Sequence, residues 1–218
     1  MDSASLFELF ENEGITFSAG VPTIWLALLQ FMREGQRSFT TLRRTVVGGA
    51  SCPPALMKAF EEELNVTIMH AWGMTETSPL GTGSRLKTKH DNLTPAESLA
   101  IRSKQGRVVF GVDMKIVGDD GQALSHDGVA FGDLLVRGPW VVREYFRSGT
   151  PGELTADGWF RTGDVATIDP DGYMQITDRS KDVIKSGGEW ISSIDLENLA
   201  VAHPAVAEAA VIGVNSEK

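Results

Sequence analysis

The chain has 218 residues, of which 42% are hydrophobic and 22% are charged, proportions that are ordinary for a globular protein. Its net charge of −9 argues against general affinity for nucleic acid or for an anionic membrane, because both require a basic surface. The single cysteine excludes an internal disulfide and a cysteine-rich metal site, and the four histidines lack the spacing of metal ligands.

The sequence shows no pattern typical of a membrane segment or of a signal peptide. The longest apolar run, residues 24–29, is far shorter than the roughly 20 residues that span a membrane. The N-terminus carries acidic residues where a signal peptide carries basic ones. We therefore expect a chain without a membrane span, located in the cytoplasm.

The first 105 residues alternate between helical and strand patterns. Residues 23–33 are apolar nearly all round, which predicts a buried helix that begins after Pro22. Further helices are expected at residues 3–13, after Pro53 and Pro54, and at 95–103, with strands at 15–18, 42–47 and 66–69. We expect the polar residues 82–105 to run over the surface. This alternation predicts an α/β sheet, in which ligands bind beyond the carboxyl ends of the strands.

After Gly106 the pattern changes to short strands at hairpin spacing, separated by Asp-Gly turns, which predicts an antiparallel β subdomain. The expected strands are residues 112–117, 132–136, 159–160, 165–168 and 173–177. A helix at 193–201 and a strand at 206–214 then indicate the opening of a further α+β domain. The predicted organisation is therefore an α/β part at 1–105, an antiparallel β subdomain at 106–179, and a third part at 180–218.

Three polar motifs stand at strand ends, namely GGASCPP at 48–54, HAWGMTE at 70–76 and DGWFRTGD at 157–164. Glycine turns allow a backbone to approach a planar ligand closely, and Trp72 offers a face on which a base can stack. Taken singly, each motif also has a purely structural interpretation, since glycine turns are common and Trp72 can belong to a core. The ordered set is therefore more informative than any member.

The same motifs carry groups suited to a nucleotide. Thr75 offers a hydroxyl for a phosphate oxygen, and Glu76 offers the hard oxygen ligand that Mg²⁺ prefers. Asp164 can accept hydrogen bonds from a ribose diol, or it can cap a turn. These residue types, taken together, indicate binding of a nucleotide with its metal ion.

A fourth stretch, residues 172–190, begins as a strand and continues through DRSKDVIKSGGEW. Clustered cations in an acidic chain require an explanation, and Arg179, Lys181 and Lys185 are such a cluster. A phosphate ester is one explanation. The alternative is a hairpin with a solvated turn, in which these cations pair with neighbouring acidic residues.

The order of these motifs resembles the adenylate-forming enzymes, the superfamily of acyl-CoA synthetases, firefly luciferase and peptide-synthetase adenylation domains. Residues 18–29, the WGMTE form and KSGGEWISSIDLEN at 185–198 are most similar to medium- and long-chain fatty acyl-CoA synthetases. The resemblance covers essentially all 218 residues, and several independent motifs agree in order and spacing. It implies the C-terminal part of the large domain, an α/β subdomain and then an antiparallel β subdomain, followed by the start of the small α+β domain.

The resemblance also implies a role for each matching residue. Gly49, His70, Ala71 and Trp72 match positions around the adenine, and Ala50 and Gly73 beside them are further expected cofactor-binding residues. Trp72 stands where most relatives have tyrosine, and a tryptophan face stacks at least as well. Thr75 matches the contact to the α-phosphate, Glu76 matches the Mg²⁺ ligand, and Asp164 with Arg179 matches the pair that holds the ribose.

The remaining matches lie near the end of the chain. Lys181 matches the hinge residue between the large and small domains, and Lys185 and Trp190 match nucleotide-side contacts. Gly187 and Gly188 match the turn that flanks the pantetheine tunnel. We expect Thr75, Glu76 and Lys181 to be the catalytic residues.

The activity that the resemblance implies has two steps. A fatty carboxylate attacks the α-phosphate of MgATP and gives acyl-adenylate and pyrophosphate, and the thiol of CoA then displaces AMP. ATP and Mg²⁺ are thus the expected co-substrate and metal, fatty acid and CoA are the expected small-molecule partners, and a homodimer is compatible with the family. Stabilisation of the phosphoryl charge and positioning are expected to supply the catalysis.

Two family motifs are missing from the 218 residues. These are a Ser/Thr/Gly-rich phosphate loop ending in lysine, and a lysine near the end of the small domain. We therefore expect a fragment of a larger fatty acyl-CoA synthetase that is inactive by itself. Two alternatives stay open: a nucleotide-binding remnant without catalysis, and a fragment of another acid–CoA ligase that uses an aryl or short-chain acid.

Overall fold

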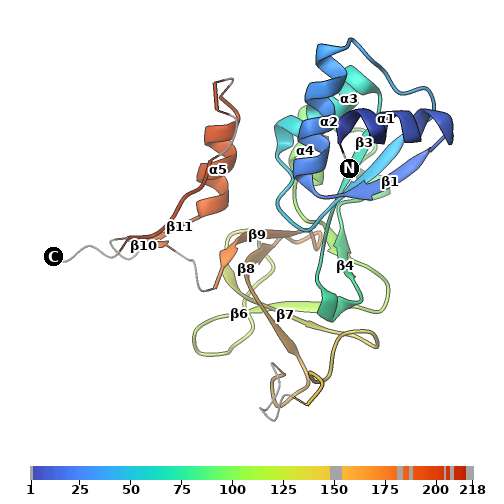
Figure 1. Cartoon of the computed structure of the whole chain (residues 1–218). Coiled ribbons are helices and arrows are strands. Elements are labelled where there is room, and N and C mark those ends of the chain that lie inside the picture. The colour runs from blue at the N-terminus through green and yellow to red at the C-terminus, as the bar shows by residue number, and fades with distance from the viewer. Residues whose placement is uncertain are drawn as a thin grey trace. The chain divides into compact units, whose positions relative to one another are not determined.

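The structure is a computed structural model that describes residues 2–147, 154–180, 184–186, 189–203, 205–206 and 209–214. The chain forms two compact units (Figure 1). The first unit consists of residues Met1–Gly73 and Gly83–Gly106, and the second consists of Met74–Thr82 and Arg107–Lys218. The first unit is thus built from two separate segments, and so is the second.

Helices of the first unit begin at residues suited to a helix start. Helix α1 (Ser3–Asn12) is capped by the Asp2 side chain, which accepts a hydrogen bond from the Ser5 N–H at 3.0 Å. Helices α2 (Pro22–Glu34), α3 (Pro54–Leu64) and α4 (Pro95–Arg102) each open on proline, whose missing N–H costs nothing in the first turn. The predicted helices are therefore confirmed, with ends that differ by a residue or two. Helix α3 ends at Asn65, which takes the left-handed conformation.

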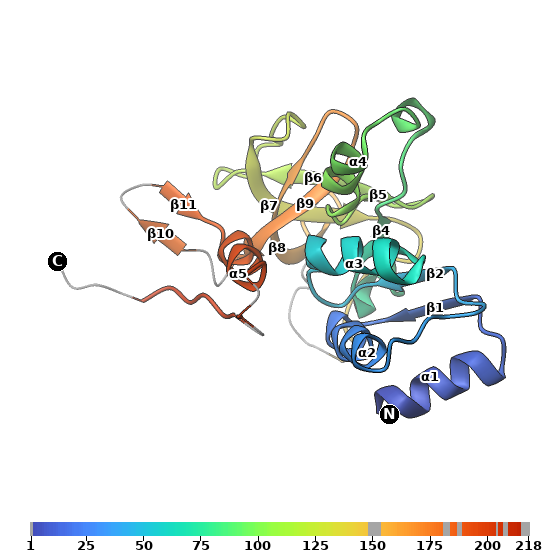
Figure 2. The same ribbon diagram turned by 90° about the horizontal axis from the view of Figure 1, so that it is seen from above.

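The strands of the first unit form a parallel arrangement in the order β1 (Phe17–Gly20), β2 (Arg44–Val47) and β3 (Thr67–Gly73). Helices α1, α2 and α3 gather around these strands (Figures 1 and 2). Their apolar faces meet in one core, where the indole of Trp25 packs edge-on against Phe60 with ring centroids 5.9 Å apart. Trp25 is thus a core residue.

The second unit begins with a one-turn 3₁₀ helix η1 (Thr75–Thr77), strand β4 (Leu80–Gly83) up to Thr82 and, after the return of the chain, strand β5 (Arg107–Val108). Between β4 and α4, the first unit carries a second one-turn helix, η2 (Thr88–His90). Strands β4 and β5 were not predicted from the sequence, and they stand at the two ends of the segment 82–105 that was expected to run over the surface. These strands are short and carry no clear alternation of apolar residues.

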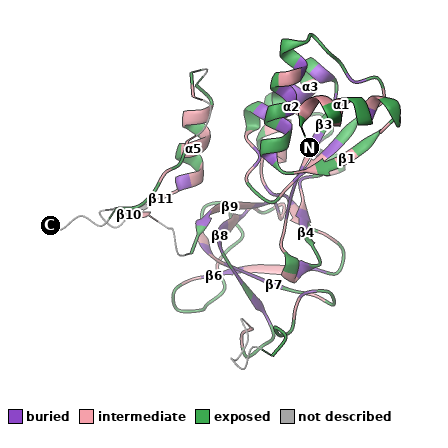
Figure 3. Ribbon diagram, in the orientation of Figure 1, coloured by how far each residue is buried: buried purple, intermediate pink, exposed green. Residues whose placement is uncertain are grey.

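An antiparallel sheet dominates the second unit, with neighbouring strands β6 (Asp113–Val117), β7 (Phe131–Arg137), β8 (Phe160–Ile168) and β9 (Met174–Arg179). Buried residues mark the middle of β7 and much of β8 (Figure 3). The two predicted strands at 159–160 and 165–168 are wrong as separate elements, because β8 runs without a break from Phe160 to Ile168. Its register shifts between Val165 and Ala166, and this irregularity interrupts the alternation that a strand prediction relies on.

The C-terminal residues form a small hairpin of β10 (Ile184–Ser186) and β11 (Glu189–Ile191), followed by helix α5 (Ser193–Val201). The Ser192 hydroxyl caps α5 by accepting from the Asp195 N–H at 3.1 Å. The predicted strand at 206–214 is wrong for residues 206 and 209–214, which are described and are not in a strand. A strand needs a partner for its backbone groups, and no described strand pairs with this segment.

Within the described part of the chain, no helix combines the length and the apolar character needed to cross a membrane.

Candidate functional site

In the first unit, the predicted site residues lie where β2 and β3 end side by side. The register pairs Val47 with His70, so the glycine turn that follows β2 lies next to the carboxyl end of β3. Gly49 has φ +82°, a conformation that favours glycine. A Cβ on Gly48 would stand 3.0 Å from the Ala71 carbonyl oxygen, which shows how closely the turn packs on β3. The structure therefore brings Gly49 and Ala50 together with His70 and Ala71.

His70 is buried, and both nitrogens of its ring are engaged. Nδ1 lies 2.8 Å from the Ser103 carbonyl oxygen, and Nε2 accepts a hydrogen bond from the Cys52 N–H at 3.3 Å. These partners require a neutral ring with the proton on Nδ1. Burial lowers the pKa of His70 from its ordinary value, against smaller opposing contributions from backbone hydrogen bonds. His70 thus fixes the turn at residues 48–52 and has no ring nitrogen free for a ligand.

The buried neutral His70 predicts a pH-dependent stability. The pKa of His70 is lower in the folded protein than in the unfolded chain. As the pH falls below about 6.5, the His70 ring therefore becomes protonated in the unfolded chain before it does so in the folded protein. We expect the free energy of unfolding to decrease between pH 7 and pH 5. Carboxylates with lowered pKa values do not cause this decrease, because they stay charged in the folded protein and in the unfolded chain over this range. Urea denaturation at both pH values measures this. His70→Gln, which does not titrate, should remove most of the decrease, and an equal decrease in that variant would contradict the assignment.

Trp72 follows on β3 and is 7% exposed, so most of its indole is covered by protein. This burial agrees with the alternative that the sequence left open, in which Trp72 belongs to the core. It leaves only a small part of the indole for contact with a base. Gly73, the last residue of β3, is half-buried.

In the second unit, Thr75 and Glu76 lie in the one-turn helix η1, which Thr77 holds together. The Thr77 hydroxyl accepts from the Met74 N–H at 3.0 Å and lies 2.7 Å from the Pro79 carbonyl oxygen. Thr75 is exposed. Glu76 is half-buried, and its Oε1 accepts a hydrogen bond from the Tyr145 hydroxyl at 2.7 Å.

Asp164 and Arg179 face each other across β8 and β9. Their Cα positions are paired in the register, and Arg179 Nε lies 3.1 Å from Asp164 Oδ1. The carboxylate is 4% exposed and the Arg179 side chain is 58% exposed. The structure therefore brings together the two residues that the resemblance assigns to the ribose.

The neighbouring Asp178 has a different role from the one that the hairpin interpretation gave it. Its buried carboxylate accepts hydrogen bonds from the backbone N–H groups of Arg179 and Ser193, at 2.7 and 3.3 Å. It therefore links the end of β9 to the start of α5.

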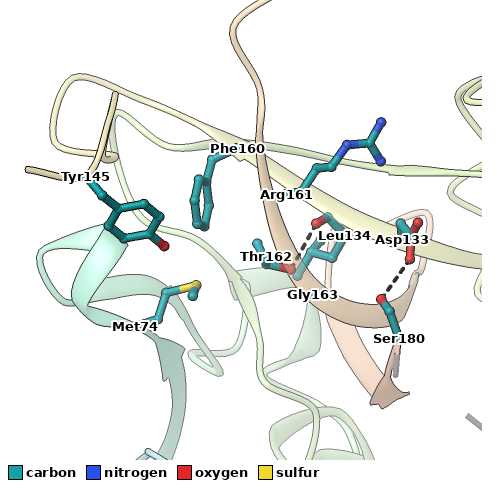
Figure 4. Close-up of a pocket in the computed structure, with 9 residues that line it drawn as sticks. All are labelled: Met74, Asp133, Leu134, Tyr145, Phe160, Arg161, Thr162, Gly163 and Ser180. Carbon is teal, nitrogen blue, oxygen red and sulfur yellow. Dashed lines mark hydrogen bonds between the residues drawn. The ribbon is translucent and has the colours of Figure 1, made fainter. Parts of the chain in front are cut away.

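A pocket of about 370 Å³ opens next to these residues in the second unit (Figure 4). Two hydrogen bonds join residues that line it. The Thr162 hydroxyl donates to the Leu134 carbonyl oxygen at 2.9 Å, and the Ser180 hydroxyl donates to the Asp133 carboxylate at 2.8 Å. Tyr145, Met74 and Phe160 line another part of it, as Figure 4 shows. Sequence reasoning missed Tyr145, and the only available signal was an aromatic residue soon after a Gly-Pro turn.

Several predicted residues cannot be placed in this site. Lys181, Gly187 and Gly188 lie outside the described residues, and so do the side chains of Lys185 and Trp190. The backbone of the β10–β11 hairpin pairs Lys185 with Trp190. The roles assigned to these five residues stay predictions.

Among the described residues, no three His, Cys, Asp or Glu side chains gather as a metal site would require. Mg²⁺ beside a nucleotide takes one or two carboxylates and completes its shell with phosphate and water, so a single carboxylate such as Glu76 would be enough to hold it. Glu76 keeps one carboxylate oxygen that receives no hydrogen bond from Tyr145. The donor set therefore fits the metal.

Comparison with known proteins identifies the family. The profile of the AMP-binding enzyme family matches residues 1–146, which is more than half of the chain. The chain belongs to the AMP-binding enzyme family. A 3-methylmercaptopropionyl-CoA ligase from Ruegeria lacuscaerulensis is 55% identical over 98% of this chain, and a medium-chain-fatty-acid–CoA ligase from Ectopseudomonas oleovorans is 48% identical over all of it. The chain spans about 40% of the length of each relative.

The solved structure of a Coenzyme A synthetase also matches this member of the AMP-binding family. The O-succinylbenzoate Coenzyme A synthetase from Bacillus subtilis, in complex with ATP and magnesium ion, superposes with a TM-score of 0.80 and 28% sequence identity. The match covers all of this chain and 42% of that protein. The predicted fold class, an α/β part followed by an antiparallel β part of an adenylate-forming large domain, is confirmed.

Proposed function

We propose that the chain is part of an ATP-dependent acid–CoA ligase, which joins a carboxylic acid to CoA through an acyl-adenylate. One observation carries the proposal: the Asp164 carboxylate is buried and paired with Arg179, as an acceptor held ready for a ribose diol would be. The Glu76 carboxylate, which accepts a hydrogen bond from Tyr145, supports it. The matches over the whole chain to relatives named as CoA ligases support it.

In this proposal, Asp164 accepts hydrogen bonds from the two ribose hydroxyls. Its carboxylate is buried, and Arg179 neutralises it from the exposed side, so the acceptor is fixed before the nucleotide arrives. A fixed acceptor needs no reorganisation on binding. Arg179, with its exposed guanidinium, is also available to the phosphate side of the nucleotide.

The exposed hydroxyl of Thr75 is proposed to donate to the α-phosphate, beside the Glu76 carboxylate that would hold Mg²⁺. The metal supplies neutralisation of the phosphate charge when it is bound. Thr75 and Glu76 are consecutive in the tight turn braced by Thr77, and this fixes the spacing between the hydroxyl and the carboxylate. The hinge role of Lys181 belongs to the same proposal and rests on the sequence alone.

We propose a medium-chain fatty acid as the acid, as in the Ectopseudomonas relative. A second candidate is a short sulfur-containing acid, because the Ruegeria relative named for 3-methylmercaptopropionyl-CoA has the higher identity, 55% against 48%. Both acids end in an apolar tail, so they differ in length more than in chemistry.

A chimeric enzyme tests the proposal. In it, this chain replaces the matching segment of the Ectopseudomonas medium-chain-fatty-acid–CoA ligase, which aligns over 218 residues. We expect the chimera to form acyl-CoA from a medium-chain acid, ATP and CoA, measured as acid-dependent release of AMP. The 218-residue chain alone is expected to show no exchange of pyrophosphate into ATP, since it contains no phosphate-loop motif.

A second chimera, built in the Ruegeria ligase, guards against failure of one host. A series of acids, from 3-methylmercaptopropionate to decanoate, distinguishes the two candidate substrates. If both chimeras fold with cooperative thermal transitions and bind AMP but release none from any acid, the alternative of a non-catalytic nucleotide-binding chain is correct.

A further inference from the structure

The turn that carries Glu76 is tied to a distant segment of the chain by three hydrogen bonds. We call residues 138–145 the strap. The Ser78 hydroxyl donates to the Trp140 carbonyl oxygen at 2.9 Å, the Val142 N–H donates to the Glu76 carbonyl oxygen at 2.8 Å, and the Tyr145 hydroxyl donates to Glu76 Oε1 at 2.7 Å. The strap therefore holds both the backbone and the side chain of Glu76.

The strap is itself anchored at its beginning. A Cβ on Gly111 would lie 2.6 Å from the Trp140 ring, and one on Gly138 would lie 2.5 Å from the Gly111 carbonyl oxygen. Gly111 has φ +86°, so glycine suits this position for its backbone as well as for its size. Val141 is 7% exposed. The part of the strap that precedes Tyr145 is thus packed closely, and Tyr145 extends from a fixed base.

A glutamate side chain has three rotatable bonds, and a half-exposed one samples several rotamers unless a partner holds it. Among the described residues, the Tyr145 hydroxyl is the side-chain partner found for the Glu76 carboxylate. It occupies Oε1 and leaves Oε2 without a hydrogen bond from Tyr145. Carboxylates that ligate a metal are themselves hydrogen-bonded, and such outer-shell partners orient the ligand.

We propose that Tyr145 is a positioning residue, which orients the Glu76 carboxylate for Mg²⁺ bound with the nucleotide. This inference rests on the proposed function, in which Glu76 is the metal ligand. Tyr145 acts through Glu76 and does not itself bind the metal. Its ring lines the pocket of Figure 4 beside Met74, so the hydroxyl reaches Glu76 from the pocket wall.

A positioning role differs measurably from a structural one. Tyr145 is 42% exposed, and the net contribution of such a hydrogen bond to folding is only about 0.5–1.5 kcal/mol. Loss of an outer-shell partner typically weakens metal affinity about 10–100-fold. Tyr145→Phe should therefore change metal binding much more than it changes the thermal midpoint.

The test uses the chimeric ligase and Mn²⁺ as the probe, with α,β-methylene ATP as a nucleotide that does not react. Electron paramagnetic resonance measures free Mn²⁺, and hence the Kd of the metal in the nucleotide complex. We expect Tyr145→Phe to raise this Kd about tenfold. Phe146→Leu, at the neighbouring 88% exposed position, is the matched control and should leave the Kd unchanged.

The same substitution in a Glu76→Ala background completes a double-mutant cycle. If Tyr145 acts through Glu76, Tyr145→Phe has no further effect once the carboxylate is gone. An unchanged Kd for Tyr145→Phe, or an equal loss in both backgrounds, overturns the positioning role. If Glu76→Ala alone leaves the Kd unchanged, then Glu76 is no metal ligand and the proposed function loses its metal assignment as well.

Discussion

Replacing Glu76 by glutamine in the chimeric ligase is expected to slow adenylate formation by about 100-fold or more. A neutral amide is a much weaker ligand than a carboxylate for hard Mg²⁺, and a metal ion contributes several kcal/mol to stabilising phosphoryl charge. The amide oxygen of glutamine can still accept the hydrogen bond that Tyr145 donates to Glu76. The turn should therefore keep its shape, and the loss should reflect the missing charge.

Rapid-quench measurement of pyrophosphate release over a range of Mg²⁺ concentrations checks this prediction. Glu144→Gln is the matched control, because Glu144 is an exposed glutamate next to Tyr145 and has no assigned role. We expect the control to react at the rate of the unmodified chimera. Equal rates for Glu76→Gln and the control at limiting Mg²⁺ would remove Glu76 from the site.

Replacing Asp164 by asparagine is expected to weaken AMP binding about 10–100-fold. Hydrogen bonds to a charged acceptor contribute about 1.5–3 kcal/mol, and each 1.4 kcal/mol changes the Kd tenfold. Asparagine keeps the volume of the side chain but offers one acceptor oxygen in place of two. The exposed Arg179 remains solvated after the change, so the fold should survive.

Isothermal titration of AMP into the chimera measures this effect. Asp157→Asn is a matched control, because Asp157 forms an ion pair with Lys115 at 3.3 Å in the same unit but on an exposed turn. Exposed pairs contribute at most about 1 kcal/mol to stability, and we expect the AMP affinity of this control to be unchanged. If the two variants lose affinity equally, the effect is general and Asp164 does not hold the ribose.

The sequence predicted the parts of the fold in which local chemistry decides the outcome. Prolines mark the starts of α2, α3 and α4, and these helices were found within a residue or two of their observed bounds. Strand β8 was predicted as two pieces, because Gly163, with φ +74°, and the register shift after Val165 break its alternating pattern. Pairing with β7 and β9 holds the strand together across this break, and no local pattern reports that pairing.

In the candidate site too, local sequence identified residues but did not indicate contacts between distant ones. Asp164 and Arg179 were named from the sequence, but their pairing across adjacent strands depends on a register that the sequence does not state. Tyr145 was missed because its partner, Glu76, precedes it by 69 residues. His70 was expected near the adenine, which stays a prediction, and the sequence did not indicate that its ring binds the backbone at Cys52 and Ser103. Contacts between residues far apart in sequence therefore account for most of what was missed.

The division of the chain into two units has a consequence for any attempt to dissect the protein. Residues Met74–Thr82 belong to the second unit, although they are flanked on both sides by segments of the first. A cut after Gly106 would release a piece that retains Tyr145, Asp164 and Arg179 but has lost Glu76 and the turn that the strap holds. The other piece would carry Glu76 without any of these partners. Neither half is thus a self-contained module, and the turn at Glu76 should regain its hydrogen bonds to the strap only when both pieces are present during refolding.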